Sequence, residues 1–166
     1  MYNIDIFNKW NQSITQQFID QQTINEKIIN NDSFHYSLPL LNDLFFISEI
    51  KKTLSIKKIF DRLIVYNAID SELIICTLIS TFILLKRLTN KYFICENMKF
   101  RIIIGLFIIS IKNMDDLHYD NLYWSKLLNI SLSDFNLIEI TLLNYLDFHT
   151  FISYEEFLSI HKMLVD

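Results

Sequence analysis

The chain has 166 residues, of which 51% are hydrophobic and 20% are charged, and its formal net charge is −4. This balance is typical of a folded globular protein of one domain and not of a disordered chain. The negative net charge predicts no strongly basic surface that could bind phosphates, so we expect no nucleic-acid partner. The sequence contains one glycine and one proline. Because the turns of β-sheet proteins use these residues often, their scarcity favours an all-α fold.

The first 37 residues are polar and contain many Asn and Gln residues. Four apolar residues predict one weakly amphipathic helix here: Ile14, Phe18, Ile24 and Ile28. Residues 30–37 predict a loop, and Pro39 begins a further predicted helix. The N-terminus does not have the pattern of a signal peptide.

Three helices are predicted in the middle of the chain, over 54–66, 70–88 and 97–112. The most apolar runs of the last two helices, 73–85 and 102–111, are shorter than the roughly 20 residues that cross a bilayer. We therefore expect these runs to lie in a protein core, and we expect no membrane partner.

The helix that ends at Lys112 is apolar on all sides from Ile102 onward, so other helices must surround it. Gly105 and Ser110 are its small residues. They allow neighbouring helices to cross close to this one, although glycine costs a helix roughly 1 kcal/mol.

The C-terminal part predicts three more helices, over 122–128, 133–146 and 153–164. Ser131 or Ser133 is the expected N-cap of the middle one. The last helix begins with Ser153 and Glu156, which have the spacing of a capping box.

Two charged residues lie where the helical pattern places apolar surface. On a helical wheel, Glu139 lies at the centre of an apolar stripe that consists of Leu132, Phe135, Leu142, Leu143 and Leu146. Lys112 continues the face of Gly105 and Ile108 at the end of the most apolar helix. A charge among apolar side chains is costly unless it is paired or hydrogen-bonded.

Two interpretations of these charges stay open. In the first, the charges have a structural role. The positive charge of Lys112 interacts favourably with the dipole at the C-terminal end of its helix, Glu139 reaches the rim of the domain, or the two side chains pair inside the domain. In the second, both point outward at one edge of the apolar surface and hydrogen-bond the backbone of a partner protein. Lysine offers donors and an ionised glutamate offers acceptors, so together they suit the free C=O and N–H groups at a partner's helix end.

The sequence shows no pattern that predicts catalysis. The four histidines are scattered and have no metal-binding spacing, and one glycine cannot form a phosphate-binding loop. We therefore expect no enzyme activity, no metal or other cofactor, and no small-molecule ligand.

The segment from Leu54 to Phe148 resembles the cyclin box, and most closely that of Pho80-like cyclins. The first two motifs are "LSIKKIFDRLI", which keeps Ile56, Phe60, Arg62 and Leu63, and "LLKRL", which keeps Arg87 and Leu88. The third, "FRIIIGLFIISIKNMDD", keeps Arg101, Lys112, Asp115 and Asp116. The remaining matches are Tyr119, Asn121, Tyr123, Ser131, Asn136, Glu139, Leu143, Leu146 and Phe148. Asn129 stands where the family has glycine, and asparagine accepts the left-handed conformation that glycine adopts there.

The resemblance implies a five-helix cyclin box around a central hydrophobic helix. The expected domains are an N-terminal helical extension over 1–46, the cyclin box over 47–150 and a C-terminal helix over 151–166. It also implies an intracellular protein of the cytoplasm or nucleus.

The function that the resemblance implies is that of a regulatory subunit, which binds and activates a cyclin-dependent Ser/Thr protein kinase as a heterodimer. Lys112 and Glu139 match the family residues that contact the kinase. Asp115 and Asp116 are further candidates, which would pair with an arginine of the kinase activation segment. The alternative function is a cyclin-fold or helical adaptor for a partner other than a kinase, for example in transcription.

Overall fold

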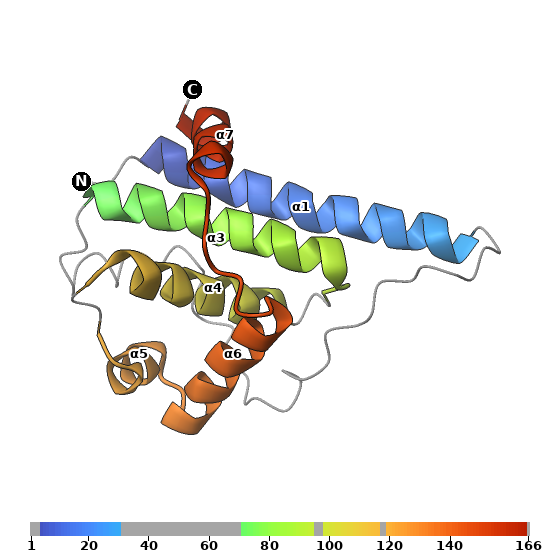
Figure 1. The fold of residues 1–166 in the computed structure, drawn as a ribbon. Helices are drawn as coiled ribbons and strands as arrows, with labels where there is room; N and C mark the ends of the chain where they lie inside the picture. Colours follow the sequence, from blue (N-terminus) through green and yellow to red (C-terminus); the bar gives the residue numbers. More distant parts are fainter. Residues whose placement is uncertain (1–3, 31–70, 95–97, 117–118, 166) are drawn as a thin grey trace.

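The structure is a computed structural model, and it describes residues 4–30, 71–94, 98–116 and 119–165. These residues form six helices and no strand (Figure 1), which confirms the predicted all-α fold. The helices are α1 (Ile4–Asn30), α3 (Ser71–Lys91), α4 (Lys99–Met114), α5 (Asn121–Leu128), α6 (Leu132–Tyr145) and α7 (Tyr154–Val165). The helices predicted near Pro39 and over 54–66 lie outside the described residues.

Helix α4 is the centre of the fold. All of its residues from Arg101 to Ile111 are buried. Helix α3 packs along it, α6 crosses it, and α5 packs on α6. Ser110 faces α3, where the hydroxyl of Thr81 lies 3.4 Å from its own. The prediction that other helices surround this apolar helix is confirmed.

Gly105 is the point at which α6 crosses α4. A Cβ atom at this position would lie 2.3 Å from Cδ1 of Leu142 and 2.8 Å from Cγ2 of Ile138. Non-bonded carbon atoms prefer separations of roughly 3.5–4.0 Å, so only glycine permits α6 to approach this closely. The predicted role of Gly105 in a close helix crossing is confirmed.

Helix α1 completes the core on the side of α3 away from α4 (Figure 1). Ile14 and Phe18 are buried, as the amphipathic pattern predicted. Hydrogen bonds add to this apolar contact. The indole Nε1 of Trp10 donates to the carbonyl of Leu78 at 2.8 Å, and the amide of Gln21 bonds the backbone just beyond the C-terminal end of α3. Helix α1 is therefore part of the same hydrophobic core as α3 and α4.

Helix α3 continues to Lys91, three residues beyond Leu88, at which the predicted helix ends. Among the described residues, the segment Leu73–Lys91 of α3 is the one helical segment that is long and apolar enough to cross a membrane. Within its most apolar window, 67% of the residues are buried inside the fold. Packing by α1, α4 and α7 therefore accounts for its apolar character.

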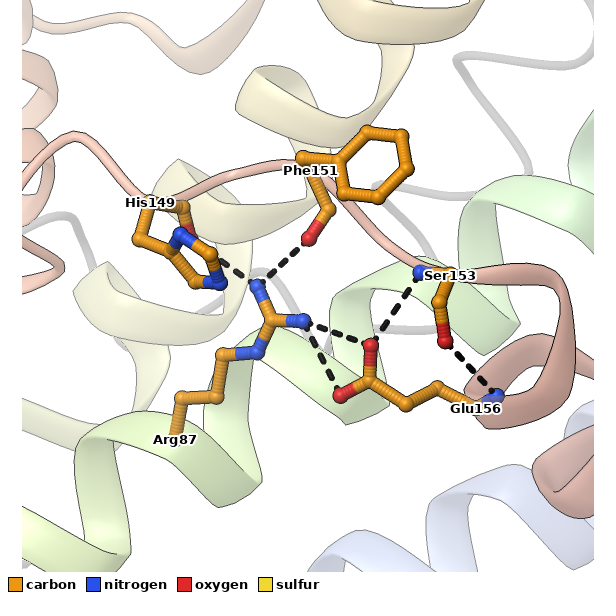
Figure 2. A network of polar contacts seen from close by, with 5 residues as sticks. All are labelled: Arg87, His149, Phe151, Ser153 and Glu156. Atoms are coloured by element: carbon orange, nitrogen blue, oxygen red, sulfur yellow. Dashed lines mark hydrogen bonds and ion pairs between the residues drawn. The ribbon is translucent and has the colours of Figure 1, made fainter.

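Arg87 of α3 holds the segment that leads to α7 (Figure 2). Its Nη1 donates to the carbonyl oxygens of His149 and Phe151 at 2.9 and 2.8 Å. Its Nη2 donates to both carboxylate oxygens of Glu156, at 3.0 and 2.9 Å. The N–H of Ser153 donates to Glu156, and the N–H of Glu156 donates to Oγ of Ser153. The predicted capping box is confirmed, and Arg87 connects it to α3.

The Arg87 guanidinium lowers the pKa of Glu156 below its ordinary value, and the hydrogen bond from the Ser153 N–H acts in the same direction. A carboxyl group with a lower pKa in the folded state stabilises that state at neutral pH and loses this effect when it is protonated. With α7 in place, Ile160 and Leu164 are buried in the shared core. The Arg87–Glu156 ion pair therefore contributes to the attachment of α7 to α3.

We expect Gly105→Ala to lower the free energy of unfolding by about 1–3 kcal/mol. The added methyl group would collide with Leu142 and Ile138, which outweighs the roughly 1 kcal/mol gain in helix propensity. Urea unfolding followed by circular dichroism measures the change. In a Leu142→Ala background the same substitution should cost less, because the nearer of the two obstructing side chains is gone. An equal cost in both backgrounds would contradict a close crossing at Gly105.

We expect wild type to unfold at a higher temperature than Glu156→Gln at pH 7, and the difference to shrink as the pH falls. The ordinary pKa of the group is 4.5, and the folded protein lowers it. The stabilisation should therefore be complete above that value and should disappear in more acidic solution as the carboxyl group becomes protonated. Thermal unfolding between roughly pH 7 and pH 3 tests this window. Glu155→Gln, at the exposed neighbouring position, is the matched control, and a difference that does not vary with pH would refute the assignment.

Candidate functional site

Lys112 and Glu139 form an ion pair between the last turn of α4 and the middle of α6. Their side chains are 19% and 18% exposed, so the pair lies at the edge of the core and in contact with solvent. The sequence left open whether Glu139 pairs with Lys112 or lies at the rim of the domain. In the structure both are true, because the two side chains pair with each other at the rim of the core.

Only part of the apolar stripe around Glu139 is buried. The buried face of α6 consists of Phe135, Ile138, Thr141 and Leu142. Leu132, which the wheel placed in the same stripe as Glu139, is 40% exposed. The predicted apolar stripe around Glu139 is thus only partly buried: Phe135, Leu142 and Leu146 are buried, and Glu139 lies at the boundary of the buried part. The close contact at Gly105 is the physical reason, since it turns Ile138 and Leu142 toward α4 and rotates Glu139 to the rim.

Two asparagines complete the site. Asn121, the first residue of α5, accepts a hydrogen bond from Lys112 through Oδ1. Its Nδ2 donates to Oε2 of Glu139 at 2.7 Å and to Oδ1 of Asn136 at 2.8 Å. We call Lys112, Asn121, Asn136 and Glu139 the Lys–Glu network. Its four side chains come from three helices, α4, α5 and α6.

The ends of α5 fix the place of Asn121. Asp120 is the N-cap, and its carboxylate accepts a hydrogen bond from the N–H of Tyr123 at 2.8 Å. At the other end, Asn129 has φ 56° and ψ 45°, the left-handed conformation expected for it. Both ends of this short helix are thus closed by local hydrogen bonds, and its first residue is held against α4 and α6.

The ammonium of Lys112 has two favourable neighbours besides the network. It lies in the last turn of α4, where the helix dipole favours a positive charge. Its Nζ also lies 5.9 Å from the centre of the Phe135 ring, at the outer range of a cation–π contact. Both contacts help to hold the Lys112 side chain in this position.

Exposed apolar side chains lie next to the network. Leu132 and Ile140 are exposed on α6, and the exposed Asn136 lies between them at a spacing of four residues. Residues at this spacing lie in a row along one helix face. The two exposed apolar side chains thus flank a polar member of the network, and such a mixture of apolar and polar groups could form part of a surface that binds another polypeptide.

Asp115 and Asp116 lie at the same end of α4 as Lys112, but they are not members of the network. Asp115 is the C-cap residue of α4, and its N–H donates to the carbonyl of Ile111 at 2.8 Å. Asp116 is exposed. The structure thus brings Lys112 and Glu139 together and leaves the two aspartates beside the pair.

Sequence reasoning did not identify Asn121 and Asn136 as site residues. Both were visible only as matches to the family motif. The spacing of Asn136 and Glu139, three residues apart on one helix, could have placed the amide beside the carboxylate. Nothing local in the sequence brings Asn121 to them, because that contact depends on how α5 packs against α6.

The described residues include no group of three or more His, Cys, Asp or Glu side chains that could hold a metal ion. Comparison with curated proteins and with solved structures found no match. A family model for cyclins matches residues 12–150, from within α1 to the segment before α7, and includes the whole Lys–Glu network. Members of this family are regulatory proteins and not catalysts. The match covers well over half of the sequence, and the chain belongs to the cyclin family.

Proposed function

We propose that the protein is a Pho80-like cyclin that binds and activates a cyclin-dependent Ser/Thr protein kinase. The observation that carries this proposal is the Lys–Glu network. It contains a preformed pair of charges, about one-fifth exposed, beside the exposed apolar side chains of Leu132 and Ile140 on α6. Membership of the cyclin family supports a protein partner, typically a kinase. The cytoplasm or nucleus, where such kinases act, is the proposed location.

The network keeps hydrogen-bonding capacity for a partner. The Lys112 ammonium has three N–H groups, and among the described residues it donates two of them, to Asn121 and Glu139. The Glu139 carboxylate accepts one bond at each oxygen and has further lone pairs. One surface spot therefore offers a donor and an acceptor, which match the free C=O and N–H groups at the end of a kinase helix.

Activation follows from binding to a rigid surface. A protein kinase is active when an ion pair between a lysine and a glutamate of its C-helix is in place, which depends on the position of that helix. The C-helix of the kinase can take an inward or an outward position. A partner that binds only the kinase with the C-helix inward shifts the equilibrium toward that position, by the difference in its affinity for the two positions. Helix α4, buried from Arg101 to Ile111, gives this surface its rigidity. In this proposal the chain contributes no catalytic group and acts through the position of the kinase helix.

We expect Lys112→Ala and Glu139→Ala each to weaken kinase binding by roughly 30-fold or more. Truncation of one partner of a largely buried charge pair at an interface costs about 2 kcal/mol or more, because it leaves the other charge unpaired. Calorimetry with a panel of purified cyclin-dependent kinase catalytic subunits measures the dissociation constants. Lys162→Ala and Glu155→Ala, both exposed on α7, are the matched controls.

Two outcomes of this experiment would count against the proposal. If the double variant keeps its helical circular dichroism and binds the kinase as tightly as wild type, the assignment of the pair is wrong. If wild type binds no kinase of the panel, the alternative function gains support, namely an adaptor for a non-kinase partner, for example in transcription.

We expect Asp115→Asn with Asp116→Asn to slow kinase association by up to about fivefold at low salt, because they remove negative charge from the rim of the interface. The effect should fade as the salt concentration rises. Stopped-flow association rates at several NaCl concentrations measure it. Asp20→Asn, exposed on α1, is the control. An unchanged rate at every salt concentration would remove the two aspartates from the kinase-binding surface.

A further inference from the structure

Asn121 contacts both charges of the network at the same time. Its Oδ1 accepts from the ammonium of Lys112, while its Nδ2 donates to Glu139 at 2.7 Å and to Asn136 at 2.8 Å. A side-chain amide can do this because it combines an acceptor oxygen with two N–H donors in one plane. A carboxylate in its place could only accept, and an ammonium could only donate.

The chemistry of its neighbours fixes the orientation of this amide. A rotation by 180° would bring Nδ2 toward the donor groups of Lys112 and Oδ1 toward the acceptor oxygens of Glu139. Both contacts would then be repulsive, and three hydrogen bonds would be lost. Asn121 therefore has one favourable orientation, and it imposes one relative position on the two charged groups.

This constraint matters because both charged side chains are long and partly exposed. Lysine carries a flexible stem, and a side chain that becomes fixed only on binding lowers the affinity by its lost conformational freedom. Asn121 sits on a helix whose two ends are closed by Asp120 and Asn129. It can therefore hold Lys112 and Glu139 in place before any partner arrives.

We propose that Asn121 is the positioning residue of the kinase-binding pair, which fixes Lys112 and Glu139 in the geometry that a kinase recognises. This inference rests on the proposed function. It goes further by assigning part of the affinity to an amide on α5 that acts through the two charges. Asn136 supports it by accepting the second N–H of the same amide.

The first test uses the free protein and needs no kinase. Unfolding free energies of wild type, Lys112→Ala, Glu139→Ala and the double variant give the coupling between the two charges. We expect this coupling to fall by at least half when the four proteins also carry Asn121→Ala. Asn11→Ala, exposed on α1, is the matched control and should leave it unchanged. An unchanged coupling in the Asn121→Ala series would overturn the positioning role.

The second test measures the affinity for a purified cyclin-dependent kinase that binds wild type. Asn121→Ala should weaken binding by about tenfold, which corresponds to the loss of preorganisation of two side chains. Asn121→Asp should weaken it more, because a carboxylate would face Glu139 and compete with it for Lys112. An acidic residue suits the first turn of a helix, so this variant should fold.

A comparison of Asn121→Ala in wild type and in the Lys112→Ala variant distinguishes the positioning role from a general structural role of Asn121. With Lys112→Ala already present, Asn121→Ala should cause a smaller loss of affinity than in wild type, whereas a general effect on α5 would cause the same loss in both. Equal losses, or full affinity of both Asn121 variants beside a wild type that binds, would overturn this inference alone. A wild type that binds no kinase of the panel would overturn the proposed function together with the kinase-binding part of this inference.

Discussion

The contact between α4 and α6 at Gly105 determines where the two charges of the site can meet. Leu142 and Ile138 occupy the space that any larger residue at this position would fill. Lys112 follows Gly105 by two helical turns on the same face of α4, and Glu139 lies on α6 between Ile138 and Leu142. The separation of the helices is therefore set by packing, and the ion pair forms because packing brings its partners within reach.

The degree of burial decides what such a pair can do. A fully exposed ion pair is weak and variable in geometry, while a fully buried one has a large desolvation cost and no access to a partner. The Lys–Glu network lies between these limits, with about four-fifths of each charged side chain covered. Its amides compensate for part of the lost hydration, and the remaining exposed part stays available for contact. This balance makes the pair suitable for recognition rather than for stability alone.

Much of the fold could be predicted from the sequence, because helical periodicity and the lack of glycine and proline are local signals. The central position of α4, the role of Gly105 and the capping box at Ser153 follow from such signals. The sequence could not decide between a Glu139 at the rim and a Glu139 inside the domain, because a helical wheel does not say which part of an apolar stripe faces a neighbour. The role of Asn121 depends on three helices at once, and no local pattern contains that information.

Arg87 binds the segment between α6 and α7 largely through main-chain oxygens, those of His149 and Phe151. Every amino acid carries a backbone carbonyl, so a substitution at His149 or Phe151 leaves both acceptors of Arg87 in the chain. Arg87 and Glu156 have no such freedom, since their bidentate pairing needs a planar cation opposite a carboxylate. The path of this segment therefore depends more on Arg87 and Glu156 than on the side chains that positions 149 and 151 present at the surface.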